Sequence, residues 1–113
     1  MKLSRSESAC LLLKERCGQD PGFREALFYE MDIQHRAWSA FNAKAQQKIE
    51  LQFYPVDMLN RPGTAFSQQD MMFIVALGNE FGWLAVAKAM HYLWQEEQEV
   101  KSFGEKLKSL FTK

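Results

Sequence analysis

Two cysteines and two histidines are the side chains of this sequence whose chemistry could support nucleophilic catalysis. A cysteine becomes a nucleophile when an electropositive, partly exposed environment stabilises its thiolate. Cys10 lies among leucines, which predicts a buried thiol. Cys17 stands at the carboxyl end of a predicted helix, where the helix dipole disfavours a negative charge. The sequence therefore predicts no catalytic residue, and we expect that the protein is not an enzyme.

His35 and His91 are the candidate metal-binding histidines. Asp32 lies three residues before His35, so on a helix its carboxylate and the imidazole share one face. A zinc site needs three or four ligands from His, Cys, Asp or Glu, and the sequence lacks the two Glu-x-x-His motifs of helical di-iron proteins. We therefore expect no metal and no cofactor. A small enzyme or metalloprotein that uses His35 or His91 is the weakest of three functional alternatives.

The spacing of the two cysteines indicates the cellular compartment of the protein. Cys10 and Cys17 lie seven residues apart, which is about 10.5 Å along a helix, whereas a disulfide needs Cα atoms within about 7 Å. Two unpaired thiols favour a reducing compartment, so we expect a cytoplasmic protein. The apolar run Ala9–Leu13 is too short for a signal-peptide core. Polar and charged residues interrupt the apolar segment Met71–Trp94, so we expect no membrane-spanning helix and no membrane partner.

Small residues recur inside this apolar segment, at Gly78, Gly82, Ala85 and Ala89. Their spacing of four, three and four places them on one stripe of an uninterrupted helix. We expect the stripe to allow close helix packing, either within the monomer or across a homodimer. If Gly82 ends a helix instead, the same residues form a tight corner between two helices.

A glycine between two helices is also a feature of the helix-turn-helix of DNA-binding proteins. With Gly82 in the turn, the recognition helix would run from Leu84 to Met90. Base-edge contacts require side chains such as Arg, Lys, Asn or Gln, and Lys88 is the only one in that run. The formal net charge of zero also differs from the basic balance of nucleic-acid binders. A DNA-associated transcriptional regulator with a degenerate motif around Gly82 is the second alternative, and we do not expect a nucleic-acid partner.

Capping residues predict where the first helices begin. Ser4 and Glu7 form a capping box ahead of a helix over Arg5–Cys17, and Gly18 is typical of the position after a helix end. We expect Leu11–Leu13 to supply the buried side of this helix.

The second helix is predicted to begin at Asp20 and Pro21, because an N-cap residue followed by proline favours a helix start. Apolar residues then recur at helical spacing across Pro21–Leu51. Since one helix of this length is long for a small protein, we expect a bend or break near Asp32–Gln34 or Ala43–Gln46. Residues 49–54 alternate between apolar and polar side chains, so they form either the end of this helix or a strand.

We predict that residues 55–66 form the main loop of the protein. Pro62 and Gly63 occupy the central positions of a type II turn that begins at Arg61. A loop that is rich in apolar and aromatic groups must either pack down or contact a partner. The candidate protein-binding residues are Tyr54, Met58, Asn60 and Arg61.

Two more capping boxes predict the remaining helix starts. Ser67 with Asp70 precedes the apolar segment, and Ser102 with Glu105 precedes a short C-terminal amphipathic helix over residues 102–113. The apolar face of that short helix consists of Phe103, Leu107, Leu110 and Phe111.

A length of 113 residues and a hydrophobic content of 47% predict one domain over residues 1–113 with its own core. We expect an all-α bundle of four to five helices in which Met71–Trp94 packs against Pro21–Leu51. The preferred function is a non-catalytic protein-binding module, such as an inhibitor, an immunity protein, an adaptor or an accessory factor. The support is the neutral charge, the many aromatic residues and the lack of catalytic motifs.

Overall fold

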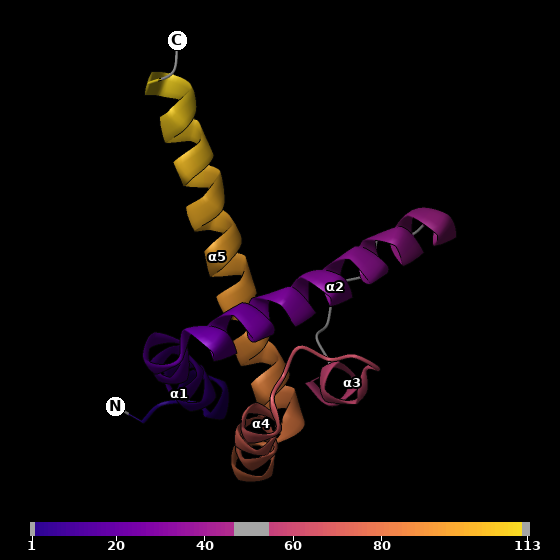
Figure 1. The fold of residues 1–113 in the computed structure, drawn as a ribbon, viewed down its shortest axis with the longest axis vertical. Coiled ribbons are helices and arrows are strands. Elements are labelled where there is room, and N and C mark those ends of the chain that lie inside the picture. The colour runs from indigo at the N-terminus through magenta and orange to yellow at the C-terminus, as the bar shows by residue number, and fades with distance from the viewer. Residues whose placement is uncertain (1, 47–54, 112–113) are drawn as a thin grey trace.

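The computed structural model describes residues 2–46 and 55–111, and within them it contains helices and no strand. The five helices are α1 (Arg5–Gln19), α2 (Pro21–Ala45), α3 (Pro55–Asn60), α4 (Gln68–Phe81) and α5 (Trp83–Phe111). The predicted all-α fold class is confirmed. Figure 1 shows α2 and α5 as two long helices that cross, with α1, α3 and α4 gathered around the lower half of α5.

Side-chain caps begin three of the helices as the sequence predicts. The Ser4 hydroxyl accepts a hydrogen bond from the Glu7 amide at 3.1 Å, and the Glu7 carboxylate accepts one from the Ser4 amide at 3.2 Å. The Asp20 carboxylate caps α2 by accepting from the amide of Phe23. Ser67 and Asp70 form the same reciprocal pair as Ser4 and Glu7 at the start of α4. These bonds satisfy amides that have no partner inside the helix.

Helix α1 is longer and less buried than predicted. It continues through Gly18 and ends at Gln19, because Asp20 takes an extended conformation and its amide donates to the carbonyl of Arg16. Of the three consecutive leucines, Leu13 is fully buried while Leu11 and Leu12 remain 55% and 39% exposed. The prediction that all three are buried is wrong, because three successive residues span far more than one face of a helix.

Helix α2 runs without interruption to Ala45, where Gln46 adopts a left-handed conformation with φ of 54°. The break predicted near Ala43–Gln46 is confirmed, and no break occurs near Asp32–Gln34. The alternatives of helix end or strand for residues 49–54 lie outside the described residues, as does Tyr54.

The segment predicted as a loop over residues 55–66 begins with helix α3 instead. Met58 in α3 is fully buried, so packing of its side chain stabilises a turn of helix that the sequence pattern does not reveal. The predicted type II turn follows. The Thr64 amide donates to the Arg61 carbonyl at 3.1 Å, and Gly63 has the required positive φ of 74°.

Gly82 ends α4 and separates it from α5, so the corner alternative for the small-residue stripe is confirmed. Its φ of 88° and ψ of 146° lie in a region that is essentially restricted to glycine. The two helices meet at 120°. Gly78 packs directly against the Trp83 ring, since a Cβ at this position would lie 2.6 Å from it. Ala89 is also buried, and it lies on the side of α5 that faces α1.

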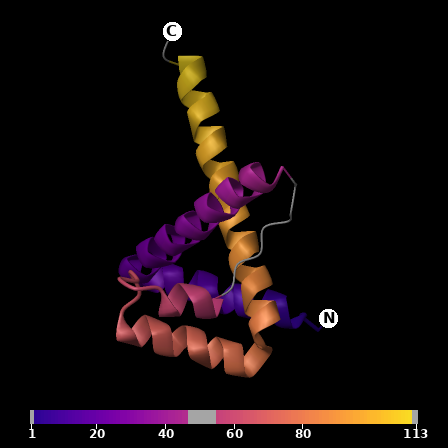
Figure 2. The ribbon, with the colours of Figure 1, turned by 90° about the vertical axis from the view of Figure 1, so that its right-hand side faces the viewer.

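Helix α5 continues as one helix from Trp83 to Phe111. The prediction of a separate C-terminal helix that starts at Ser102 is wrong. Helix α5 continues through this capping-box sequence and through Gly104. The second half of α5 extends beyond the other helices in both views of the fold (Figures 1 and 2).

The core lies where α1, the first half of α2 and the first half of α5 meet above α3 and α4. Helix α5 packs most extensively along α1, not along α2 as predicted. Helix α2 reaches α5 through long polar side chains: the Trp94 indole donates to Asp32 at 2.8 Å, and Arg24 pairs with Glu97 at 2.8 Å. The largest fully buried apolar side chains are Leu13, Phe23, Leu27, Met31, Met58, Ile74, Val86 and Met90.

Candidate binding groove between α1 and α5

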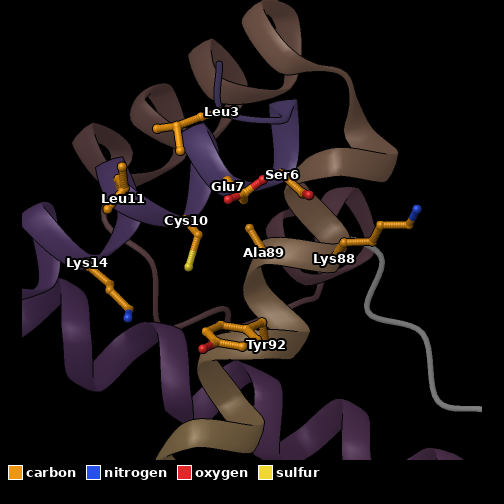
Figure 3. Close-up of a pocket in the computed structure, with 9 residues that line it drawn as sticks. All are labelled: Leu3, Ser6, Glu7, Cys10, Leu11, Lys14, Lys88, Ala89 and Tyr92. Carbon is orange, nitrogen blue, oxygen red and sulfur yellow. The ribbon is translucent and has the colours of Figure 1, made fainter. Parts of the chain in front are cut away.

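An open groove of about 520 Å³ lies between α1 and the first half of α5 (Figure 3). We call it the α1–α5 groove. Figure 3 shows the Cys10 thiol and the Ala89 methyl group directed into it from opposite helices. Small side chains at these two positions leave the space between the helices unfilled. The residues that line the groove are Leu3, Ser6, Glu7, Cys10, Leu11, Lys14, Lys88, Ala89 and Tyr92.

The border of the groove carries large apolar side chains that no other part of the described structure covers. Leu3, Leu11 and Tyr92 are 47%, 55% and 56% exposed. A soluble domain buries such side chains when it can, and contiguous exposed apolar surface marks sites of interaction. The groove therefore offers apolar contact area on both of its sides.

One ion pair lies at the end of the groove. The Lys14 ammonium lies 3.2 Å from the Glu96 carboxylate, which raises the pKa of Lys14, and it lies 5.7 Å from the centre of the Tyr92 ring. Both charged groups are about half exposed, so the pair contributes little to stability. It bridges α1 and α5 at this end of the groove.

The groove does not activate the Cys10 thiol. Burial raises the pKa of Cys10 above its ordinary value, and the nearby Lys14 only partly opposes this effect. Burial raises the pKa of Cys17 to about 11. Both thiols are free, and both remain protonated at neutral pH. The groove thus presents an apolar surface with a neutral thiol.

The predicted protein-binding residues of the loop are not brought together on a surface. Met58 is fully buried in the core, while Asn60 is exposed at the end of α3. Arg61 donates from Nε and from a terminal nitrogen to the two carboxylate oxygens of Glu30, at 2.7 and 2.6 Å. Its role in the structure is therefore to attach the turn to α2.

Glu30 is the buried charged residue that sequence patterns did not reveal. Its side chain is fully inaccessible, and it accepts a third hydrogen bond from the Ala65 amide at 2.9 Å. The hydrogen bonds from Arg61 lower the pKa of Glu30 against the opposing effect of burial. Because Arg61 lies 31 residues further along the chain, no local spacing could identify this pair.

The two histidines do not form a metal site. Asp32 accepts the Trp94 indole hydrogen bond, and the His35 ring lies 4.2 Å from the centre of the Trp94 ring. Within residues 2–46 and 55–111, no cluster of three His, Cys, Asp or Glu side chains could hold a metal ion. Asp32 and His35 of α2 thus both contact Trp94 of α5, and His91 also lies near Trp94.

The corner at Gly82 differs from a helix-turn-helix in the length of its turn. One residue separates α4 from α5, whereas the DNA-binding motif has a turn of about three to four residues. On the first two turns of α5 the well-exposed side chains are Leu84 and Lys88, of which only Lys88 can donate to a base edge.

Comparison with known proteins gives no relative: neither a family model, nor a curated protein, nor a solved structure matches this chain. In the described part of the chain, no individual helix has both the length and the hydropathy needed to cross a bilayer. Helices α4 and α5 meet that requirement only when they are counted together across their sharp corner.

Proposed function

We propose that this protein is a non-catalytic, cytoplasmic binding module that acts by holding a segment of another protein in the α1–α5 groove. It would act as an inhibitor, an immunity protein, an adaptor or an accessory factor. The observation that carries the proposal is the groove itself, whose exposed borders are apolar and whose thiol is neutral. An amphipathic helix that inserts its apolar side chains between two helices is a common mode of peptide recognition.

The groove chemistry favours a partner with two or three apolar side chains on one helix face. Leu3 and Leu11 would contact one side of such a segment, and Tyr92 would contact the other. Aromatic residues often supply a large share of binding energy at interfaces, because they bury a large area with few rotatable bonds. Cys10 and Ala89 would accept side chains that reach the floor of the groove.

Affinity capture from a native cell extract, with nuclease treatment and mass spectrometry, tests this proposal. We expect the wild-type chain to retain one stoichiometric protein after nuclease treatment. Leu11→Glu should lose that protein, because a carboxylate on the border of the groove must be desolvated on binding. Met72→Glu is the matched control, since Met72 is 66% exposed on α4 and does not line the groove.

Two results would contradict the proposal. Retention of the partner by a folded Leu11→Glu variant would show that the contact lies elsewhere. Loss of all captured protein after nuclease treatment would instead support the nucleic-acid alternative, whose binding should weaken steeply with salt.

A further inference from the structure

A separate pocket of about 380 Å³ lies where α2 and α5 cross (Figure 1). We call it the crossing pocket. Its volume falls within the range of about 300–1,000 Å³ that is typical of sites for small molecules. Most of its lining is polar or charged, in contrast to the α1–α5 groove. The lining residues are Tyr29, Asp32, His35 and Arg36 of α2, and Trp94 and Gln98 of α5.

Arg36 is the cation of the crossing pocket. On a helix, an aspartate four residues before an arginine is placed to pair with it. Here the Asp32 carboxylate instead accepts a hydrogen bond from the Trp94 indole at 2.8 Å. Within residues 2–46 and 55–111, Arg36 forms no ion pair. Its guanidinium is therefore available to an anion, and this group binds phosphate through paired hydrogen bonds.

Two further groups of the pocket have hydrogen-bonding capacity left. Asp32 holds the indole through Oδ1, and its Oδ2 has no partner among the described residues, so Oδ2 can accept from a hydroxyl. Nδ1 of His35 is shielded from solvent and makes no hydrogen bond in the described part of the chain. Buried polar groups normally have a partner. Because imidazole can carry its proton on either nitrogen, His35 can donate to an anion held by Arg36.

The crossing pocket also has an aromatic border. The Tyr29 side chain is 54% exposed. Trp94 is fixed in place by its hydrogen bond to Asp32 and by the His35 ring, whose centre lies 4.2 Å from that of the indole. Tyr29 therefore presents open ring surface beside a rigid contact, and such a ring is a platform on which a planar base stacks.

We propose that the crossing pocket binds a nucleoside monophosphate. The base stacks on Tyr29, a ribose hydroxyl donates to Asp32, and the phosphate accepts from Arg36 and His35. A carboxylate is a common partner of ribose hydroxyls, and an arginine is a common partner of phosphate. An inorganic anion alone would leave Tyr29 unused and would be repelled by Asp32. This inference does not depend on the α1–α5 groove.

Titration of the full chain with adenosine monophosphate, followed by nuclear magnetic resonance, tests the proposal. The signal of the Trp94 indole N–H should shift and saturate, because the ligand lies beside this ring. Adenosine and inorganic phosphate should each bind at least about tenfold more weakly, since each lacks one of the recognised groups. No saturation below about 10 mM, or equal affinity for adenosine and its monophosphate, would overturn the proposal.

Variants of the charged group test the phosphate contact. Arg36→Gln should weaken binding of adenosine monophosphate about tenfold and leave that of adenosine unchanged, because only the phosphate contacts the guanidinium. Arg5→Gln is the matched control, since Arg5 is exposed and does not line the pocket. Equal losses in the two variants would assign the binding to general charge attraction and overturn the proposal.

Variants of the aromatic group test the base contact. Tyr29→Ala should weaken binding of both adenosine and its monophosphate, because both carry the base. Tyr92→Ala should weaken neither, since Tyr92 is similarly exposed, at 56%, but lines the α1–α5 groove. Equal losses in these two variants would show adsorption to exposed aromatic surface and would also overturn the proposal.

Discussion

At the scale of single residues, Glu30 is a fully buried carboxylate that joins two distant parts of the chain. It accepts hydrogen bonds from two nitrogens of the Arg61 side chain and from the Ala65 amide, and it connects the turn after α3 to the first half of α2. The sequence pattern predicts the turn that begins at Arg61, but it does not identify the residue that attaches this turn to α2.

Replacement of this carboxylate should be costly. We expect Glu30→Gln to lower the free energy of unfolding by about 2–3 kcal/mol, because removal of one member of a buried pair leaves the other uncompensated. The value is below that of a fully buried pair because the Arg61 side chain is 27% exposed. Urea denaturation measures it, with Glu25→Gln on the exposed side of α2 as the control. A change no larger than that of the control would show that the pair is not a stabilising contact.

The same pair makes stability depend on pH. The pKa of Glu30 in the folded protein lies below its ordinary value of 4.5. Its contribution is therefore fully present above that ordinary value, and it is lost as the pH falls through the folded pKa. Thermal melts from pH 6 down to about pH 3 should show a steeper loss for wild type than for Glu30→Gln. Parallel curves for the two proteins would contradict the lowered pKa.

The two thiols should react slowly. Because burial raises the pKa of Cys10 and raises that of Cys17 to about 11, little thiolate is present at pH 8, and alkylation by iodoacetamide should be much slower than in the urea-unfolded chain. Mass spectrometry of timed samples measures both rates. A native rate equal to the unfolded rate at either cysteine would show that its thiol is accessible and ionised.

At the scale of elements, the three helix starts that carry side-chain caps were predictable, whereas the start of α3 and the continuation of α1 and α5 were not. The caps at Ser4, Asp20 and Ser67 use contacts within three residues, so the sequence contains the whole interaction. Helix α1 continues through Gly18 and α5 continues through Ser102, although the local residue pattern predicts a helix boundary at each position. Helix α3 likewise forms around the buried Met58 side chain, which no local pattern indicates.

Substitution of two glycines tests whether backbone conformation ends a helix at Gly82 and not at Gly18. Gly82→Ala should lower the free energy of unfolding by about 1–3 kcal/mol, since its φ of 88° is strained for any other residue even though the surrounding space is open. Gly18→Ala, inside α1 with open space around it, should raise stability by up to about 1 kcal/mol. Chemical denaturation of the two variants measures both. Equal effects of the two substitutions would show that backbone conformation does not matter at the corner.

The α1–α5 groove could likewise be predicted only in part, because some of its features depend on neighbouring residues in the sequence and others on residues that are far apart. The three consecutive leucines of α1 indicate that this helix has more apolar surface than one core contact can cover. That signal could have identified Leu11 as a border residue. The position of the groove could not be predicted, because it depends on α1 packing beside Ala89 and Tyr92, about eighty residues later in the chain.

At the scale of the whole molecule, residues 100–111 of α5, which we call the α5 arm, extend beyond the globular body (Figures 1 and 2). The last core residue along the chain is Leu93, and the side chains of the arm are mostly exposed. We expect a chain that stops after Lys101 to keep the melting temperature of the full protein within a few degrees, measured by circular dichroism at a concentration where both are monomeric. A large fall in melting temperature would show that the arm stabilises the body.

The long packing interface between α1 and α5 also sets the order in which the chain can fold. Helix α1 is made first during synthesis, but the helix that buries Ala9 and Leu13 is made last. Contacts between segments this far apart slow folding, because a large loop must close before they form. On the ribosome, the apolar side of α1 must therefore wait uncovered until the first half of α5 has emerged. During that interval it is accessible to chaperones and to other nascent chains.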